Sequence, residues 1–438
     1  MALKQNYDVP EWVDAKGKIN EVLFCDEFVK EHPMRFVDNR FTDIYGTVAN
    51  ERIKKLISDM LSPYVFAGLS RRIGGIFDYL KLYCYAESLP NCSDEIHVQN
   101  GVLKISGRFI ERMDICANRL NVRYNNKADE PRVFLRFIHD LLEDEDILTL
   151  QEYLGYCLIP STRAQAMLFI IGNGGEGKSR LGVVLKSIFG DSMIESQLHR
   201  LESDRFARAN LQNMLLMVDD DLQLEAFSST GCIKTLVTAE TPVDVELKGQ
   251  QSYQAKLYAR FLSFGNGSPK SLYDKTEGFS RRMIILTTKP IPQDRKVDRY
   301  IADRMIEEKE GIFNWMFEGL QRLIGNSFCF TISDKAKQNN AEMMSDNCNI
   351  IGFLADENVV FFGDDRQISS MELYKSYDNW CELNALTALK RDTFLNWLRN
   401  NQEKYNIKFS YNIHHLGRRV RGFSGLSAFQ LPIVDKGV

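Results

Sequence analysis

The chain has 438 residues, 44% of them hydrophobic and 26% charged, and a formal net charge of −4. These values indicate a globular protein with room for several domains, and they exclude a disordered chain or one that coats nucleic acid through a basic surface all over. The nine cysteines are scattered, so we expect reduced thiols and no structural metal site. No signal peptide or membrane-length apolar run is apparent, and we expect a cytoplasmic protein that does not enter a membrane.

The first 95 residues carry no motif to which a chemistry can be assigned. Helical patterns cover 52–69, as far as Pro63, and 74–89. An Asn100-Gly101 step between two β-like runs then predicts a hairpin over 95–107. Apolar residues recurring at helical spacing predict two more helices within 131–160.

The stretch GNGGEGKS over 172–179 fits the phosphate-loop pattern G-x-x-x-x-G-K-[ST]. An apolar run over 164–173 is typical of a buried strand, and the helix expected after the loop ends at Gly190. Glycines let successive backbone N–H groups face a phosphate, and the helix directs its positive end at the same anion. We expect Lys178 to reach the β- and γ-phosphates of ATP and Ser179 to ligate Mg²⁺. The expected nucleotide-binding residues are Gly172, Asn173, Gly174, Gly175, Glu176, Gly177, Lys178, Ser179 and Arg180.

A second buried strand, over 213–222, ends in three consecutive aspartates. Its spacing from the loop fits a neighbouring strand, where acids can supply a metal ligand and a base that activates water. We assign the metal to Asp219 and the base to Asp220. Asp221 is a rival for either role, and the weaker rivals are Glu225 and Glu240.

Two further strand ends help to separate a motor from a small-molecule kinase. Asn266 follows a third buried strand, over 259–266, where its amide can touch the γ-phosphate or hold the attacking water. Arg281 and Arg282 begin a fourth strand, and an arginine at a subunit edge can act as a finger in the neighbouring site. Strands alternating with helices over about 160–325 indicate an α/β domain with a mostly parallel sheet.

Residues 242–261 show alternation on both sides of Lys248-Gly249-Gln250, which predicts a β-hairpin with a lysine at its tip. In a ring-shaped assembly, such a hairpin would project into the channel and grip a phosphodiester backbone.

The C-terminal part begins with 333–349, which suits a linker or an exposed helix. Two helices follow, over 371–383 and 388–401, and then two β-like segments over 404–413 and 418–427. Between residues 390 and 424 there are eight basic and two acidic residues, which suits a winged helix on duplex DNA. The basic candidates for DNA binding are Lys390, Arg391, Arg418, Arg419 and Arg421.

GNGGEGKS, LLMVDDDL, the lysine-bearing hairpin, FGN and GFSRR occur in the order and spacing of superfamily 3 helicases. From about residue 95 onward, the chain resembles the helicase part of phage and plasmid primase–helicase proteins more closely. The resemblance implies an AAA+ ATPase core with a helical N-terminal region and a C-terminal winged helix. It also implies a homo-hexamer that uses ATP and Mg²⁺, and that moves along single-stranded DNA in its channel, usually 3′→5′. By residue match, the resemblance gives Lys178 and Ser179 the phosphate-loop roles, Asp219 and Asp220 the acidic motif, Asn266 the sensor, Arg281 the finger and Lys248 the hairpin contact to DNA.

The chain departs from that family in two respects. Glu176 stands where an asparagine is common, and the first 95 residues show neither a zinc cluster nor a carboxylate set for primer synthesis. This layout resembles the self-loading replication initiator helicases of staphylococcal pathogenicity islands and related mobile elements. The division expected is an N-terminal domain over 1–95, a helical collar-like domain over 96–160, the AAA+ domain over 161–325, and a linker with a winged helix over 326–438.

The function expected is therefore an ATP-dependent DNA helicase in replication initiation of a phage, plasmid or genomic island, inside a bacterial host cell. Its expected partners are single-stranded DNA in the ring, duplex origin DNA at the winged helix, and other replisome proteins. Two alternatives stay open: an ATP-switched origin-binding protein that recruits another helicase, and a P-loop kinase. The hairpin lysine and the finger position favour the motor over the switch, which needs neither. Asn266, the finger position and the basic C-terminal part argue against the kinase.

Overall fold

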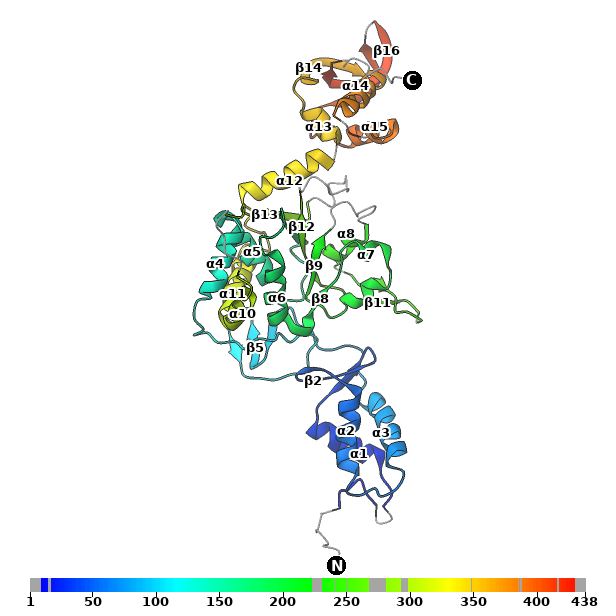
Figure 1. Cartoon of the computed structure of the whole chain (residues 1–438). Coiled ribbons are helices and arrows are strands. Elements are labelled where there is room, and N and C mark those ends of the chain that lie inside the picture. The colour runs from blue at the N-terminus through cyan, green and yellow to red at the C-terminus, as the bar shows by residue number, and fades with distance from the viewer. Residues whose placement is uncertain are drawn as a thin grey trace, which may run out of the picture. The chain divides into compact units, whose positions relative to one another are not determined.

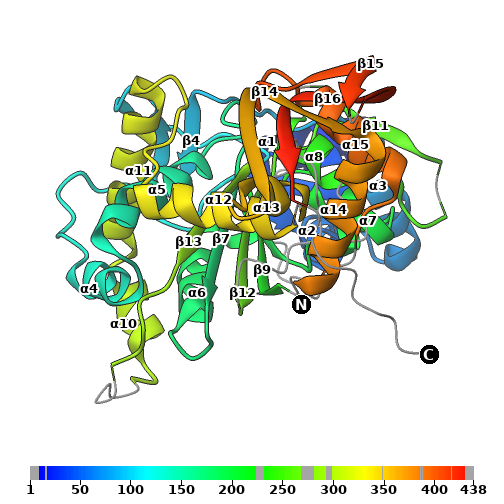
Figure 2. The same cartoon turned by 90° about the horizontal axis from the view of Figure 1, so that it is seen from above.

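A computed structural model describes residues 9–14, 17–222, 231–239, 241–249, 251–267, 281–292, 298–347, 349–384, 386, 388–415 and 417–429 (Figures 1 and 2). The chain divides into two compact units. The first comprises Met1–Leu222, Gly231–Asn266 and Leu286–Ser333, and the second Gln223–Thr230, Gly267–Ile285 and Asp334–Val438. Among the described residues, no helix has the length and apolar character needed to cross a membrane.

The N-terminal part of the first unit packs three helices with a small antiparallel sheet of order β1-β2-β3. The side chain of Asn20 caps the first helix by accepting from the N–H groups of Val22 and Leu23. Both predicted helices are confirmed, whereas the short strands carry too little alternation to be predicted. The elements are α1 (Glu21–Glu31), β1 (Arg35–Val37), β2 (Arg40–Asp43), β3 (Gly46–Val48), α2 (Asn50–Leu61) and α3 (Leu69–Tyr83).

A second antiparallel sheet and two helices follow. The predicted hairpin is present, but its turn is Gln99–Asn100, because Gly101 already pairs with Val98 across the strands. The two helices predicted within 131–160 are also confirmed. The elements are β4 (Glu95–Val98), β5 (Gly101–Lys104), β6 (Phe109–Ile110), α4 (Arg132–Leu141) and α5 (Asp144–Tyr156).

The largest sheet has five strands in the order β13-β7-β12-β9-β8; its strands β7, β12, β9 and β8 belong to the first unit and run parallel. The four strands predicted over 164–288 are β7 (Met167–Gly172), β9 (Leu216–Leu222), β12 (Arg260–Asn266) and β13 (Met283–Thr287), and the edge strand β8 (Met193–Glu195) is an addition. The acidic strand β9 does not neighbour β7, because β12 lies between them. The expectation of a neighbouring strand was therefore wrong.

Helix α6 (Lys178–Phe189) packs on one face of this sheet and ends at Gly190 as expected. A Cβ atom on Gly182 would lie 3.5 Å from the Phe264 ring of β12 and 3.9 Å from Val218 of β9, so the helix lies against both strands. The carboxyl ends of β7, β12 and β9 thereby come together near the start of α6. The other short elements of this part are η1 (Gly190–Ser192), α7 (Arg200–Ser203), η2 (Ala207–Leu211), α8 (Gly231–Thr238) and α10 (Ile301–Glu307).

Helix α11 (Lys309–Gly325) packs closely against α5. Gly319 makes this approach feasible, because a Cβ atom there would collide with the backbone of Gln151, and Gly155 faces the backbone of Leu320 in the same way. At one end of the contact, Arg322 donates to the fully buried Glu152 carboxylate at 2.6 Å. The two helices therefore form one tightly joined pair.

The hairpin predicted around Lys248 is confirmed. Strands β10 (Val243–Val245) and β11 (Tyr253–Ala255) pair antiparallel, with Val243 opposite Ala255. Gly249 has a φ of +80°, a conformation that favours glycine at the turn.

The C-terminal part of the second unit has the order helix, helix, strand, two helices and two strands, and its sheet has the order β14-β16-β15. The expected helices and strands of this part are confirmed, and of the two expectations for 333–349 the structure shows the helix, over Asp334–Asn347. The helix and strand that precede them were not predicted. The elements are α12 (Asp334–Asn347), α13 (Asn349–Ala355), β14 (Val360–Ser369), α14 (Ser370–Leu383), α15 (Arg391–Asn400), β15 (Lys408–His415) and β16 (Arg418–Ala428).

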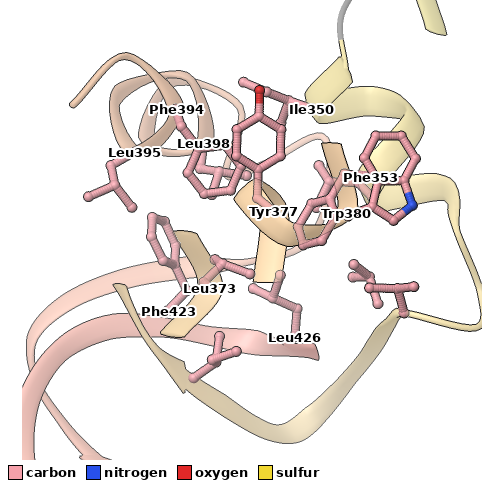
Figure 3. Packing of buried hydrophobic residues seen from close by; sticks show 14 of the residues in the cluster. Ile350, Phe353, Leu373, Tyr377, Trp380, Phe394, Leu395, Leu398, Phe423 and Leu426 are labelled. Atoms are coloured by element: carbon pink, nitrogen blue, oxygen red, sulfur yellow. The ribbon is translucent and has the colours of Figure 1, made fainter. Parts of the chain in front are cut away.

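Figure 3 shows the buried cluster that joins α13, β14, α14, α15 and β16. Tyr377 of α14 stacks on Phe394 of α15 with ring centroids 4.3 Å apart, and Phe353 of α13 meets both rings edge-on. Phe423 and Leu426 bring β16 into the same core. The cluster holds the hairpin of β15 and β16 against the helices.

Candidate functional site

The loop between β7 and α6 has the backbone of an anion cradle. Gly174, Gly175 and Gly177 have φ values of +97°, +82° and +107°, which side-chain-bearing residues rarely adopt. All six residues of β7 are buried, and α6 begins at Lys178 directly after Gly177. The loop therefore sits on a fixed strand, and the positive end of a twelve-residue helix is directed at it.

The buried ammonium group of Lys178 has two partners in the described chain. It donates to the Glu176 carboxylate at 2.8 Å and to the side-chain oxygen of Asn266 at 3.1 Å. Asn266, at the end of β12, is thus brought to the loop as expected from the sequence. The strand order explains this contact, since β12 is the immediate neighbour of β7.

Glu176 has a role that the sequence alone did not indicate. Its carboxylate is buried and accepts from the backbone N–H groups of Asn173 and Gly174 as well as from Lys178. Burial raises the pKa of this carboxyl, but the hydrogen bonds from Lys178 and from the backbone outweigh that effect and hold the pKa below its usual value. Glu176 is therefore an ionised counter-charge inside the loop.

A cavity of about 460 Å³ opens in front of the loop. This volume lies in the range of ordinary ligand sites. The loop residues Gly174 to Arg180 line the cavity, together with Asn266 and Asp220. Further lining residues that no sequence motif signalled are Phe137, Ile291, Asp298, Arg299 and Ile301.

The three aspartates of β9 differ in their surroundings. Asp220 is exposed and lines the cavity. Asp219 is only 2% exposed, and its carboxylate accepts from the backbone N–H of Leu198 at 2.7 Å and that of Asp221 at 3.3 Å. Burial raises the pKa of Asp219. The structure thus brings Asp220 to the loop and ties Asp219 to the backbone. The rivals Glu225 and Glu240 lie outside the described residues.

The remaining expected positions are on the surface. Lys248 is exposed at the turn of the β10–β11 hairpin, whereas Gln250 lies outside the described residues. Arg281 is exposed just before β13 and belongs to the second unit.

The expected DNA-binding residues of the C-terminal part are all exposed. Lys390 and Arg391 lie at the start of α15, and Arg418, Arg419 and Arg421 lie on β16. In the part of the chain that the structure describes, the three arginines of β16 form no ion pair with a carboxylate. Their charges are free to meet an external anion.

Part of the sequence matches a known family model, and 91% of the chain can be compared with solved structures. Residues 170–282, from the end of β7 to Arg282, match the model of a family of unknown function, DUF5906. No curated protein matches the chain.

Among solved structures, the chain is similar to the apo structure of the NrS-1 C-terminal region (305–718), with 10% identity and a TM-score of 0.52 over 91% of this chain and 97% of that one. A second apo structure of that region, called its A form, gives 12% identity and a TM-score of 0.53 over 91% and 98%. At such identities the similarity concerns the fold, which is α/β with a central sheet that is largely parallel.

Proposed function

We propose that this chain is an ATP-hydrolysing DNA motor, an AAA+ helicase of the superfamily 3 type that acts in replication initiation of a phage, plasmid or genomic island. One observation carries the proposal: three parallel strands deliver a phosphate loop, an amide and a carboxylate to one cavity. The fold similarity to the NrS-1 C-terminal region and the lysine-tipped hairpin support it.

The residues around the cavity have the chemistry that ATP with Mg²⁺ requires. Lys178 and the backbone N–H groups of the loop would bind the phosphates, and Arg180 and Arg299 supply two further cations in the cavity lining. Ser179 and Asp220 line the same cavity and offer a hydroxyl and a carboxylate oxygen, the ligand types that Mg²⁺ takes. When bound, Mg²⁺ would neutralise charge on the phosphate oxygens.

We assign the role of Mg²⁺ ligand to Asp220 rather than to Asp219, which the sequence had suggested. Both oxygens of Asp219 already accept from backbone N–H groups. The side chain of Asn266 lies beside Lys178 and would orient either the γ-phosphate or the attacking water. Because β12 separates β7 from β9, Asn266 enters the site between the loop strand and the acidic strand.

The DNA-directed parts of the proposal rest on exposed basic residues. Lys248 would contact a single strand in the channel of a homo-hexamer, and Arg281 would complete the site of a neighbouring copy. The order of helices and strands in the C-terminal part is that expected of a winged helix, and its exposed arginines suit contacts to duplex phosphates.

The test is strand displacement on a forked duplex with ATP and Mg²⁺. The unaltered chain should separate the strands, and Lys178→Ala should abolish both separation and ATP hydrolysis. Asp220→Asn should do the same without loss of fold, because Asp220 is exposed. Lys256→Ala is the control, since it removes an exposed lysine that does not line the cavity.

One result would reject the helicase. If the unaltered chain hydrolyses ATP at a rate that DNA does not change and separates no strands, the chain is a nucleotide-controlled DNA-binding protein or a kinase. DNA binding that depends on the bound nucleotide would then distinguish the first of these from the second.

A further inference from the structure

An aromatic–arginine row crosses the C-terminal part and has no role in the nucleotide site. It consists of Arg399 on α15, Phe409 and Tyr411 on β15, and Arg421 on β16. The guanidinium carbon of Arg399 lies 4.0 Å from the centroid of the Phe409 ring, and that of Arg421 lies 5.4 Å from the centroid of Tyr411. The rings of Phe409 and Tyr411 meet edge-to-face at 5.1 Å. The row is therefore continuous from helix to hairpin.

The outer end of the row is open to solvent. Tyr411 is 64% exposed, whereas Phe409 is partly buried against Phe423 of the domain core. An aromatic ring that is anchored on one edge and free on the other is typical of a contact surface.

A β-bulge sets the direction of Tyr411. Ser410 pairs with Gly422 and Ile413 pairs with Val420, so Tyr411 and Asn412 together oppose the single residue Arg421. Bulges of this kind bend a strand and redirect a side chain. β15 is also an edge strand, since the sheet has the order β14-β16-β15. The backbone of the hairpin therefore fixes the exposed position of the Tyr411 ring.

The charge around the ring fits a polyanion. Lys408, Arg418 and Arg419 are exposed on the same two strands, and no described carboxylate pairs with Arg421. Arginines and an open aromatic ring together suit nucleic acid, because the cations meet phosphates while the ring stacks on a base.

We propose that Tyr411, supported by Phe409 and Arg421, is a stacking site for an unpaired base, so that the C-terminal part binds DNA at a junction between duplex and single strand. In an intact duplex the faces of each base are covered by its neighbours, and the ring could stack only on a base released from that stack. This inference rests on the proposed DNA binding and adds the type of DNA that is bound.

The test uses the full chain without nucleotide and with Lys248→Ala, so that the channel hairpin does not contribute. Fluorescence anisotropy compares a blunt duplex with the same duplex carrying a single-stranded overhang. Tyr411→Ala should weaken binding to the overhang DNA about tenfold, as expected when one base–aromatic stack is removed, and change binding to the blunt duplex less than about twofold. Tyr411→Phe should bind both DNAs like the parent, because stacking needs the ring and not the hydroxyl.

Arg419→Ala is the matched control and should weaken binding to both DNAs alike, as expected for a phosphate contact. The inference is overturned if Tyr411→Ala weakens both DNAs equally or neither, or if Tyr411→Phe is as weak as Tyr411→Ala. If the parent chain binds neither DNA, the proposed DNA binding itself fails. The two failures are therefore distinguishable.

Discussion

At the level of single residues, Glu176 is the least expected member of the proposed nucleotide site. Its buried carboxylate neutralises Lys178 and accepts from two N–H groups of the loop. A nucleotide that enters the cavity brings negative charge to the same lysine. Glu176 and the phosphates therefore compete for Lys178.

We expect Glu176→Gln to bind ADP and ATP about tenfold more tightly than the unaltered chain, because the competing negative charge is removed while an oxygen remains for the loop N–H groups. Titration with a fluorescent nucleotide measures the change. Lys178→Ala serves as the control that does not bind. Weaker binding by Glu176→Gln would show instead that the charge is needed to shape the loop.

Replacement of Asp220 should impair ATP hydrolysis, whereas replacement of its neighbour Asp219 should impair stability. Asp220→Asn should reduce Mg²⁺-dependent ATP hydrolysis about 100-fold or more with little change in the melting temperature, because the side chain lines the cavity and is exposed. Asp219→Asn should lower the melting temperature, because an amide keeps one accepting oxygen and turns an NH2 donor toward the other of the N–H groups of Leu198 and Asp221. ATPase assays and thermal unfolding of both variants check this; the reverse pattern would restore the metal role to Asp219.

The sequence predicted which residues lie at this site where they belong to one short motif. The position of the loop glycines, Lys178 and Ser179 at one cavity could be predicted from local spacing, because the phosphate-loop pattern is contained in eight consecutive residues. The three aspartates could not be told apart, since their difference lies in which face of β9 meets Leu198. Arg299 joins the cavity only through the fold and carries no local signal.

At the level of elements, the strands and helices with strong apolar patterns were predicted correctly. β7, β9, β12 and α6 fall where the apolar runs and the Gly190 stop indicated. The position of β12 between β7 and β9 was not predicted, because strand order depends on contacts between segments far apart in the sequence. Short strands such as β1 and β8, with three residues each, give too few positions to show a period.

The α5–α11 contact offers a test of close helix packing. Gly319→Ala should destabilise the protein by about 3 kcal/mol, because the added methyl group collides with the backbone of Gln151. Gly325→Ala in the same helix is the matched control, since a Cβ atom there meets nothing within 4 Å. Chemical denaturation followed by circular dichroism gives both values. Equal stability of the two variants would mean that α5 and α11 shift apart at little cost.

At the level of the whole molecule, charge is unevenly distributed along a chain of net charge −4. The stretch over 390–424 has eight basic and two acidic residues, and the arginines of β16 are exposed. The overall charge therefore predicts little about DNA binding, whereas the local surplus predicts a salt-sensitive interaction.

We expect the affinity of the full chain for duplex DNA to fall steeply with salt concentration. Replacing Arg418 and Arg419 together by alanine should reduce the slope of log K against log salt by about 2, because each arginine that neutralises a phosphate accounts for about one unit of that slope. Binding titrations between about 50 and 200 mM salt give the slope. The paired replacement of Lys335 and Lys337 on α12 is the control. An unchanged slope would place the phosphate-binding residues elsewhere.

The buried cluster of the C-terminal part is drawn entirely from residues between Ile350 and Leu426. Such a core can form without help from the proposed nucleotide site, because all of its members come from one continuous stretch of the chain. A mutation that disables the phosphate loop would therefore leave this part folded. On the proposed function, the disabled chain would still occupy its DNA and enter mixed assemblies with intact copies, so that a minority of defective molecules would inhibit the majority.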